Sequence, residues 1–266
     1  MMDVSEKRKK KWRLALAVTG AALVIFLALG IFVYKAVAEG GPHLPIYSVE
    51  TDEKDVAVTV NCAWGDADIP ELLALFDEYD VEATFFILGQ WAEKYPDSTR
   101  AIAEAGHEIG SHSNTHPNMT GIGEGRIREE LDRSAEHIKR ACGIQPVLFR
   151  APSGAYDNQL IDVAAKLGYQ TIQWDVDSRD WQNPSSEEMA ENVLSAVRPG
   201  SILLFHSGAK NTPAALAQIL QGLTDQDYDF VNVSDLIYEK EYSIDTNGRQ
   251  VSLAREDRDD RDDRDD

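Results

Sequence analysis

The chain has little cysteine and far fewer basic than acidic residues. Its 2 cysteines in 266 residues exclude a disulfide-rich scaffold. The 26 lysines and arginines against 46 aspartates and glutamates give a formal net charge of −20, which argues against nucleic-acid binding because phosphate backbones would be repelled. Hydrophobic residues make up 43% of the chain, so a globular core rather than a disordered chain is expected.

The N-terminus joins a basic segment to a long uncharged one. Residues 1–13 hold six lysines and arginines, and residues 14–34 hold no charged residue. A helix over residues 14–34 rises about 30 Å, the thickness of a bilayer's hydrocarbon core. The positive-inside rule keeps the basic segment in the cytoplasm. We therefore predict a single-pass signal anchor in the cell membrane with an extracytoplasmic domain, although Ala36-Val37-Ala38 resembles a signal-peptidase site and leaves cleavage open.

Two further segments lack the periodicity of packed structure. Residues 35–52 include Gly40-Gly41-Pro42 and form a predicted linker. Residues 241–266 end in repeats of Arg-Asp-Asp and form a predicted acidic low-complexity tail. The sequence thus predicts one domain, over residues 53–240.

Within this domain, short β-rich runs alternate with helical patterns. This alternation predicts a parallel α/β sheet, open or closed into a barrel. Seven strands are expected, at residues 56–60, 83–88, 108–111, 147–149, 169–173, 202–205 and 229–233. Asp68 is a predicted helix N-cap, with Glu71 completing a capping box. Cys62 and Cys142 would lie at opposite ends of the sheet, so both are expected to be free thiols.

Two histidines four residues apart, His112 and His116, follow the third predicted strand. On one helical turn this spacing would aim both imidazoles at one metal ion, and neutral imidazoles bind zinc well. A catalytic zinc site normally adds a third protein ligand. From spacing alone, a purely structural role for the pair stays open.

Charged and aromatic residues also follow the later predicted strands. The carboxyl ends of parallel strands meet at one edge of a sheet, so these side chains predict a ligand cleft. His206, at the tip of the sixth strand, is a candidate general acid near Asp180. Taken alone, His206 would be a capping histidine.

Four motifs, in this order, resemble the polysaccharide deacetylase family, the NodB-homology domain of carbohydrate esterase family 4. They are His112-Ser-Asn-Thr-His116-Pro, Arg150-Ala-Pro-Ser-Gly-Ala-Tyr156, Asp177-Ser-Arg-Asp180-Trp181 and Leu204-Phe-His206. The resemblance spans residues 53–238 and implies an α/β fold of the distorted (β/α)7 barrel type, here preceded by the single N-terminal transmembrane helix.

By this resemblance, His112 and His116 would bind a divalent metal, with zinc the expected ion, which polarises an N-acetyl carbonyl and activates a water. Arg150 would orient the catalytic base, and His206, tuned by Asp180, would protonate the leaving amine. The residues implied in substrate binding are Tyr156, Trp174, Trp181 and Leu204. The products would be acetate and a free amino sugar.

The first motif departs from the family, which carries Thr-Phe-Asp-Asp where this chain has Thr59-Val-Asn61-Cys62. Asn61 takes the base position, and an amide has no useful proton affinity. Cys62 takes the position of an aspartate ligand. Its thiolate could complete a Cys-His-His zinc site, with Asp66 as the alternative, or Cys62 could be a small buried residue.

Arg150 would then face the neutral Asn61. Three interpretations are open at this point: an ion pair with Asp177, an ion pair with Asp180, or direct contact with a substrate carboxylate.

Two functions follow from the resemblance. The first is a membrane-anchored, metal-dependent hydrolase that removes N-acetyl groups from cell-wall polysaccharide, either peptidoglycan or chitin-like amino sugars. The second is a glycan-binding or morphogenetic pseudoenzyme that uses the same cleft without turnover, as the changes at Asn61 and Cys62 favour. The partner in either case is an N-acetylated cell-wall glycan.

Overall fold

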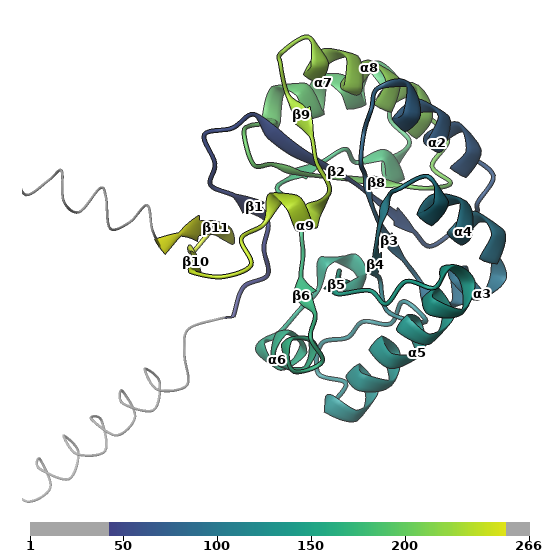
Figure 1. Cartoon of the computed structure of the whole chain (residues 1–266), viewed down its shortest axis with the longest axis vertical. Helices are drawn as coiled ribbons and strands as arrows, with labels where there is room; N and C mark the ends of the chain where they lie inside the picture. The colour runs from purple at the N-terminus through teal and green to yellow at the C-terminus, as the bar shows by residue number, and fades with distance from the viewer. Residues whose placement is uncertain (1–42, 254–266) are drawn as a thin grey trace, which may run out of the picture. The chain divides into compact units, whose positions relative to one another are not determined.

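The computed structural model describes residues 43–253 (Figure 1). The predicted basic segment 1–13, the predicted transmembrane segment 14–34 and the last residues of the predicted tail, 254–266, lie outside the described residues. Within residues 43–253, no helix is long and apolar enough to cross a membrane.

A parallel sheet forms the centre of the fold. In spatial order its strands are β6 (Gln170–Thr171), β5 (Leu148–Phe149), β4 (Glu108–Ser111), β3 (Thr84–Ile87), β2 (Asp55–Cys62), β8 (Ile202–His206) and β7 (Val176–Asp177), with β9 (Asp229–Phe230) also paired to β2. All seven predicted strands have a counterpart here, and β7 was missed. β6 and β7 are the two edge strands of this order and do not pair with each other. The sheet of the described residues is therefore a curled half-barrel, and the predicted barrel does not close.

Helices alternate with these strands, as predicted. They are α2 (Ile69–Glu78), α3 (Gly89–Lys94), α4 (Pro96–Glu104), α5 (Glu124–Cys142), α6 (Asn158–Lys166), α7 (Ser186–Ala196), α8 (Thr212–Thr224) and α9 (Val233–Leu236). Contacts run from α7 to α8, α2, α4, α5 and α6 in turn, so these helices cover the outside of the curled sheet (Figure 1). This arrangement leaves the carboxyl ends of the strands free to form a site.

Strand β2 shows how the sheet sorts its side chains. Val58, Val60 and Cys62 belong to the apolar core under the helices. Successive residues of a strand point to opposite faces. Thr59 and Asn61 therefore point to the other face, where both accept hydrogen bonds from Arg150. The alternation thus places Asn61 in the site and Cys62 in the core.

The folded part extends beyond both predicted boundaries. β1 (Ser48–Val49) lies in the predicted linker, whereas β10 (Tyr242–Ile244) and β11 (Arg249–Ser252) lie in the predicted tail. The three form one small sheet in which β11 pairs in parallel with β1 and antiparallel with β10. The linker at 35–52 and the tail at 241–266 were therefore drawn too wide. β1 and β11 pair across about two hundred residues, which local patterning does not reveal, whereas β10 and β11 form a local pair that was missed.

Two smaller predictions have different outcomes. Cys62 and Cys142 are free thiols, as expected. Helix α2 begins directly after Asp68, also as expected, but the side chain of Asp68 does not cap it. Its Oδ2 instead accepts the backbone N–H of Gly208 at 2.7 Å, which ties the start of α2 to the loop after β8.

Candidate functional site

A cavity of about 400 Å³ lies at the carboxyl ends of the central strands. Seven of the predicted site residues line it: Asn61, His112, His116, Trp174, Trp181, Leu204 and His206. Its remaining lining residues are Ala63, Trp64, Ser153 and Asp177. Arg150 and Asp180 lie behind this surface and are 0% and 1% exposed. The cavity therefore brings together residues from motifs far apart in the sequence.

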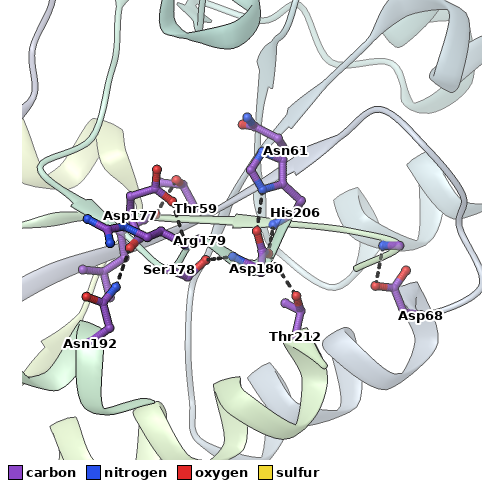
Figure 2. Close-up of polar contacts among 12 residues, drawn as sticks. Thr59, Asn61, Asp68, Asp177, Ser178, Arg179, Asp180, Asn192, His206 and Thr212 are labelled. Atoms are coloured by element: carbon purple, nitrogen blue, oxygen red, sulfur yellow. Dashed lines mark hydrogen bonds and ion pairs between the residues drawn. The ribbon is translucent and has the colours of Figure 1, made fainter. Parts of the chain in front are cut away.

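One side of the cavity is built around His206. Its ring Nδ1 lies 2.7 Å from Asp180 Oδ1, and its backbone N–H donates to Asp180 Oδ2 at 2.6 Å. Thr212 Oγ1 donates to the same Oδ2 at 2.9 Å, so Asp180 lies between His206 and Thr212 (Figure 2). Because a carboxylate accepts but cannot donate, His206 Nδ1 carries a proton and Nε2 is left to the cavity. We call His206, Asp180 and Thr212 the acid side.

A second side, on the neighbouring strand β2, is built around Arg150, and we call Asn61, Thr59 and Arg150 the base side. Arg150 Nη1 donates to Thr59 Oγ1 at 2.8 Å and to Asn61 Oδ1 at 3.0 Å, and Nη2 donates to the Gln173 carbonyl at 3.0 Å. The guanidinium lies 4.0 Å from the ring centre of Phe86, within cation–π distance. Arg150 thus reaches the base position, as its predicted role requires, but finds an amide there.

The sequence left three partners open for Arg150, namely Asp177, Asp180 and a substrate carboxylate, and all three are wrong. Asp180 is bound to His206 and Thr212, and Asp177 Oδ1 accepts the backbone N–H of Arg179. Arg150 forms no ion pair within the described part of the chain, and its complete burial prevents direct contact with a substrate carboxylate. Burial lowers the pKa of the Arg150 guanidinium, because it is cut off from water.

The two histidines His112 and His116 lie side by side, with ring centres 5.1 Å apart. His112 Nδ1 is 2.8 Å from the Arg150 carbonyl oxygen, which can only accept, so Nδ1 carries the proton and Nε2 is a free acceptor. Burial lowers the pKa of His112 to about 3, which keeps the ring neutral at physiological pH. A neutral ring oriented by a carbonyl is the arrangement that metal-binding histidines use.

A third metal ligand does not join this pair. Cys62 is 0% exposed in the apolar core, and burial raises the pKa of its thiol to about 12, so it is not a thiolate. Asp66 Oδ2 accepts the hydroxyl of Ser98. Residues 43–253 contain no group of three His, Cys, Asp or Glu side chains that could hold a metal ion. The residues present therefore do not fit a zinc ion held by three protein ligands.

The predicted sugar-binding residues divide into two groups. Trp174, Trp181 and Leu204 line the cavity. Tyr156 does not, and its hydroxyl instead accepts a hydrogen bond from Tyr47 at 3.1 Å. Sequence reasoning missed Trp64, whose ring stacks on His206 with centres 5.5 Å apart.

Trp64 and Trp181 are 52% and 53% exposed, unusual values for so large an apolar side chain, and exposed indoles beside a cavity are suited to stack on sugar rings. Trp64 could have been predicted to line the cavity, because it follows the carboxyl end of β2 by two residues.

Comparisons with known proteins agree with this site. The family model described as polysaccharide deacetylase matches residues 48–172. An uncharacterized Bacillus subtilis protein, YlxY, is 35% identical over 195 residues, which are 73% of this chain and 61% of that relative. A Bacillus cereus protein named peptidoglycan-N-acetylglucosamine deacetylase is 32% identical over 199 residues, covering 73% of this chain and 93% of the relative.

A solved structure adds a second kind of relative. The crystal structure of a CE4 family pseudoenzyme from Bacillus anthracis has a TM-score of 0.70 and 33% identity to this chain, covering 72% of this chain and 68% of that one. A mutant of that pseudoenzyme is described as having restored enzymatic activity. These similarities, with the four motifs gathered around one cavity, show that the chain belongs to the polysaccharide deacetylase family.

Proposed function

We propose that the cavity binds an N-acetylated amino sugar of a cell-wall glycan and removes its acetyl group slowly. The observation that carries this proposal is the hydrogen-bonded acid side, which faces the same cavity as an incomplete base side. The named Bacillus cereus relative supports peptidoglycan as the glycan, and other relatives named as chitooligosaccharide deacetylases support a chitin-like one.

In the proposed reaction, water adds to the acetyl carbonyl and gives its proton to solvent, the C–N bond breaks, and the amine leaves with a proton from His206. His206 supplies that proton from Nε2, where the cavity gives the substrate access. Asp180 holds the ring by Nδ1 and stabilises the imidazolium that must precede the transfer. The exposed rings of Trp64 and Trp181 stack on the sugar.

The slow rate follows from Asn61. A water that attacks a carbonyl must lose a proton, and an amide side chain cannot take it. Loss of a general base lowers the rate typically by about 10² to 10⁴-fold. Zinc stays a prediction, and no step depends on it here. Elemental analysis of the full chain, with His112→Ala as control, tests whether the histidine pair retains metal.

Binding without any turnover is the second candidate function. It is favoured by the contact between Arg150 and Asn61, which leaves the base position without a proton acceptor, and by the similarity to a pseudoenzyme. The two candidates share the ligand and differ only in the release of acetate.

The test measures binding and acetate release together on the full-length chain, with N-acetylglucosamine oligomers and peptidoglycan. We expect binding that Trp181→Ala weakens, and slow release that His206→Ala abolishes. His137→Ala, which changes a histidine outside the cavity, is the matched control and should leave both unchanged. Binding with no release would favour the pseudoenzyme, and no binding to either glycan would contradict both candidates.

We also propose that residues 14–34 anchor the domain to the cell membrane on its extracytoplasmic side. The support is the uncharged length of this segment and the basic residues before it. The full chain should stay in the membrane fraction after an alkaline wash, whereas a chain without residues 1–34 should be released. Release of the full chain by the wash would contradict the anchor.

A further inference from the structure

The amide of Asn61 has a fixed orientation. An arginine side chain only donates hydrogen bonds, so the group facing Arg150 Nη1 at 3.0 Å must be the amide oxygen. The Nδ2 group, with its two N–H bonds, is then the end of the side chain left to the cavity that Asn61 lines. A carboxylate base would present an acceptor at this position, whereas Asn61 presents a donor.

A positive charge lies directly behind this donor. The three acceptors of Arg150 are a hydroxyl, an amide oxygen and a carbonyl, all of them neutral. Its Nε is buried without a hydrogen-bond partner. A guanidinium keeps its proton in proteins. A charge that is buried and unpaired acts over a longer range than one in water, because little solvent screens it.

The other charged or titratable groups at the cavity do not neutralise Arg150. Asp180 is bound by His206 and Thr212. His112 and His116 carry no negative charge. Asp177 is the one carboxylate among the residues lining this cavity in the described part of the chain, and its Oδ1 accepts the backbone N–H of Arg179. Figure 2 shows Asp177 beside Arg179, on a different strand from Asn61.

We propose that Asn61, with Arg150 behind it, forms the floor of a carboxylate-binding subsite. The replacement that removes the base thus reverses the polarity of the base position, which now attracts an anion. This deepens the proposed function and rests on it for the identity of the cavity as the glycan site. The carboxylate has two sources: free acetate, or a carboxyl group carried by an acidic amino sugar.

The test compares acetate with acetamide, its neutral counterpart of nearly the same shape. Both are titrated into the full-length chain at constant ionic strength, and the indole N–H signals of the tryptophans are followed by NMR. We expect acetate to bind at least tenfold more tightly than acetamide. In Asn61→Asp the order should reverse, with acetamide preferred, because the new carboxylate repels acetate and accepts from the amide.

Asn247→Asp is the matched control, since it adds the same charge at an exposed turn outside the cavity and should keep the preference for acetate. Equal binding of acetate and acetamide by the unmodified chain would overturn the subsite. An unchanged preference in Asn61→Asp would also overturn it.

The two sources are separated by a second titration with N-acetylglucosamine and N-acetylmuramic acid, which carries a carboxyl group. Tighter binding of the acidic sugar, lost in Asn61→Asp, assigns the subsite to the sugar's carboxylate. Equal binding of both sugars, with acetate still preferred over acetamide, assigns it to free acetate. Preference for acetate with no binding of either sugar supports the subsite and contradicts the glycan function, so the two proposals fail separately.

Discussion

The acid side and the base side of the cavity lie on neighbouring strands, but the charged group of each side has different hydrogen-bond partners. Asn61 of β2 is paired with His206 of β8, so the pairing of these two strands positions both the acid side and the base side. On the acid side, the histidine meets a buried carboxylate that accepts three hydrogen bonds. On the base side, a buried guanidinium meets neutral acceptors only.

This difference shows that a site can keep its geometry after losing half of its chemistry. Arg150 still reaches the base position because Thr59 and the Gln173 carbonyl hold it there without help from a carboxylate. The amide of Asn61 has nearly the shape of an aspartate side chain and occupies the same hydrogen bond. What is lost is one negative charge and one proton acceptor, and both can be put back by a single substitution.

The largest expected effect comes from restoring the base. Asn61→Asp should raise the rate of acetate release from N-acetylglucosamine oligomers by about 10²-fold, the lower end of what a general base contributes. Arg150 is already placed to orient the new carboxylate. Asn61→Ala should give no gain. An unchanged rate in Asn61→Asp would mean that the base side lacks more than the base.

The same substitution should also change stability. A carboxylate beside Arg150 would neutralise a buried charge, and we expect Asn61→Asp to raise the free energy of unfolding by about 2 kcal/mol at pH 7. The guanidinium lowers the folded-state pKa of such an aspartate below its unfolded value of about 3.9. The gain is therefore fully present above that value and is lost as the pH falls through the folded-state pKa.

Urea unfolding at pH 7 and pH 3 measures this gain. A variant less stable than the unmodified chain at pH 7 would contradict the account of Arg150 as an unpaired charge.

His107 differs from His206 because it is a buried histidine whose ring, among the described residues, is bound by no carboxylate. Its Nδ1 accepts the backbone N–H of Ala83, its Nε2 is buried with no partner, and burial lowers its pKa to about 4. The unfolded chain takes up this proton near pH 6.5 and the folded chain only near pH 4, so stability is lost as the pH falls between them.

We expect His107 to account for about 2 kcal/mol of this loss, after allowance for solvent screening. His107→Gln, which keeps an acceptor for Ala83, should flatten the dependence of the unfolding free energy on pH between 7 and 4.5. An equally steep profile in the variant would assign the loss to other groups.

Much of the fold could be predicted from the sequence because its signals are local. The seven predicted strands are runs of β-rich residues, and the same alternation with helices places the site at their carboxyl ends. The small sheet of β1, β10 and β11 was not predicted. The pairing of β1 with β11 spans most of the chain and leaves no local signal, whereas β10 and β11 form a local antiparallel pair that was missed. Neither could the closure of the barrel, which depends on how far the sheet curls.

The site, like the fold, has residues that the sequence predicted and residues that it did not. The motifs identified His206, Asp180, His112 and His116 by spacing and order, and all four lie in or just behind the cavity. Two of the neutral partners of Arg150, Thr59 and Asn61, share one face of β2, and the third is the Gln173 carbonyl after β6. No local signal in the sequence connects either place to Arg150. The position of Cys62 was missed, because the motif placed it at the site, whereas the alternation of side chains continues to the last residue of β2 and turns Cys62 to the core.

A double-mutant cycle would show whether the acid side is complete and only the base side is deficient. Acetate release would be measured for the unmodified full-length chain, Asn61→Asp, His206→Ala and the double variant. We expect Asn61→Asp to raise the rate about 10²-fold only when His206 is present, since both act in one transition state. An equal gain in the His206→Ala background would contradict it.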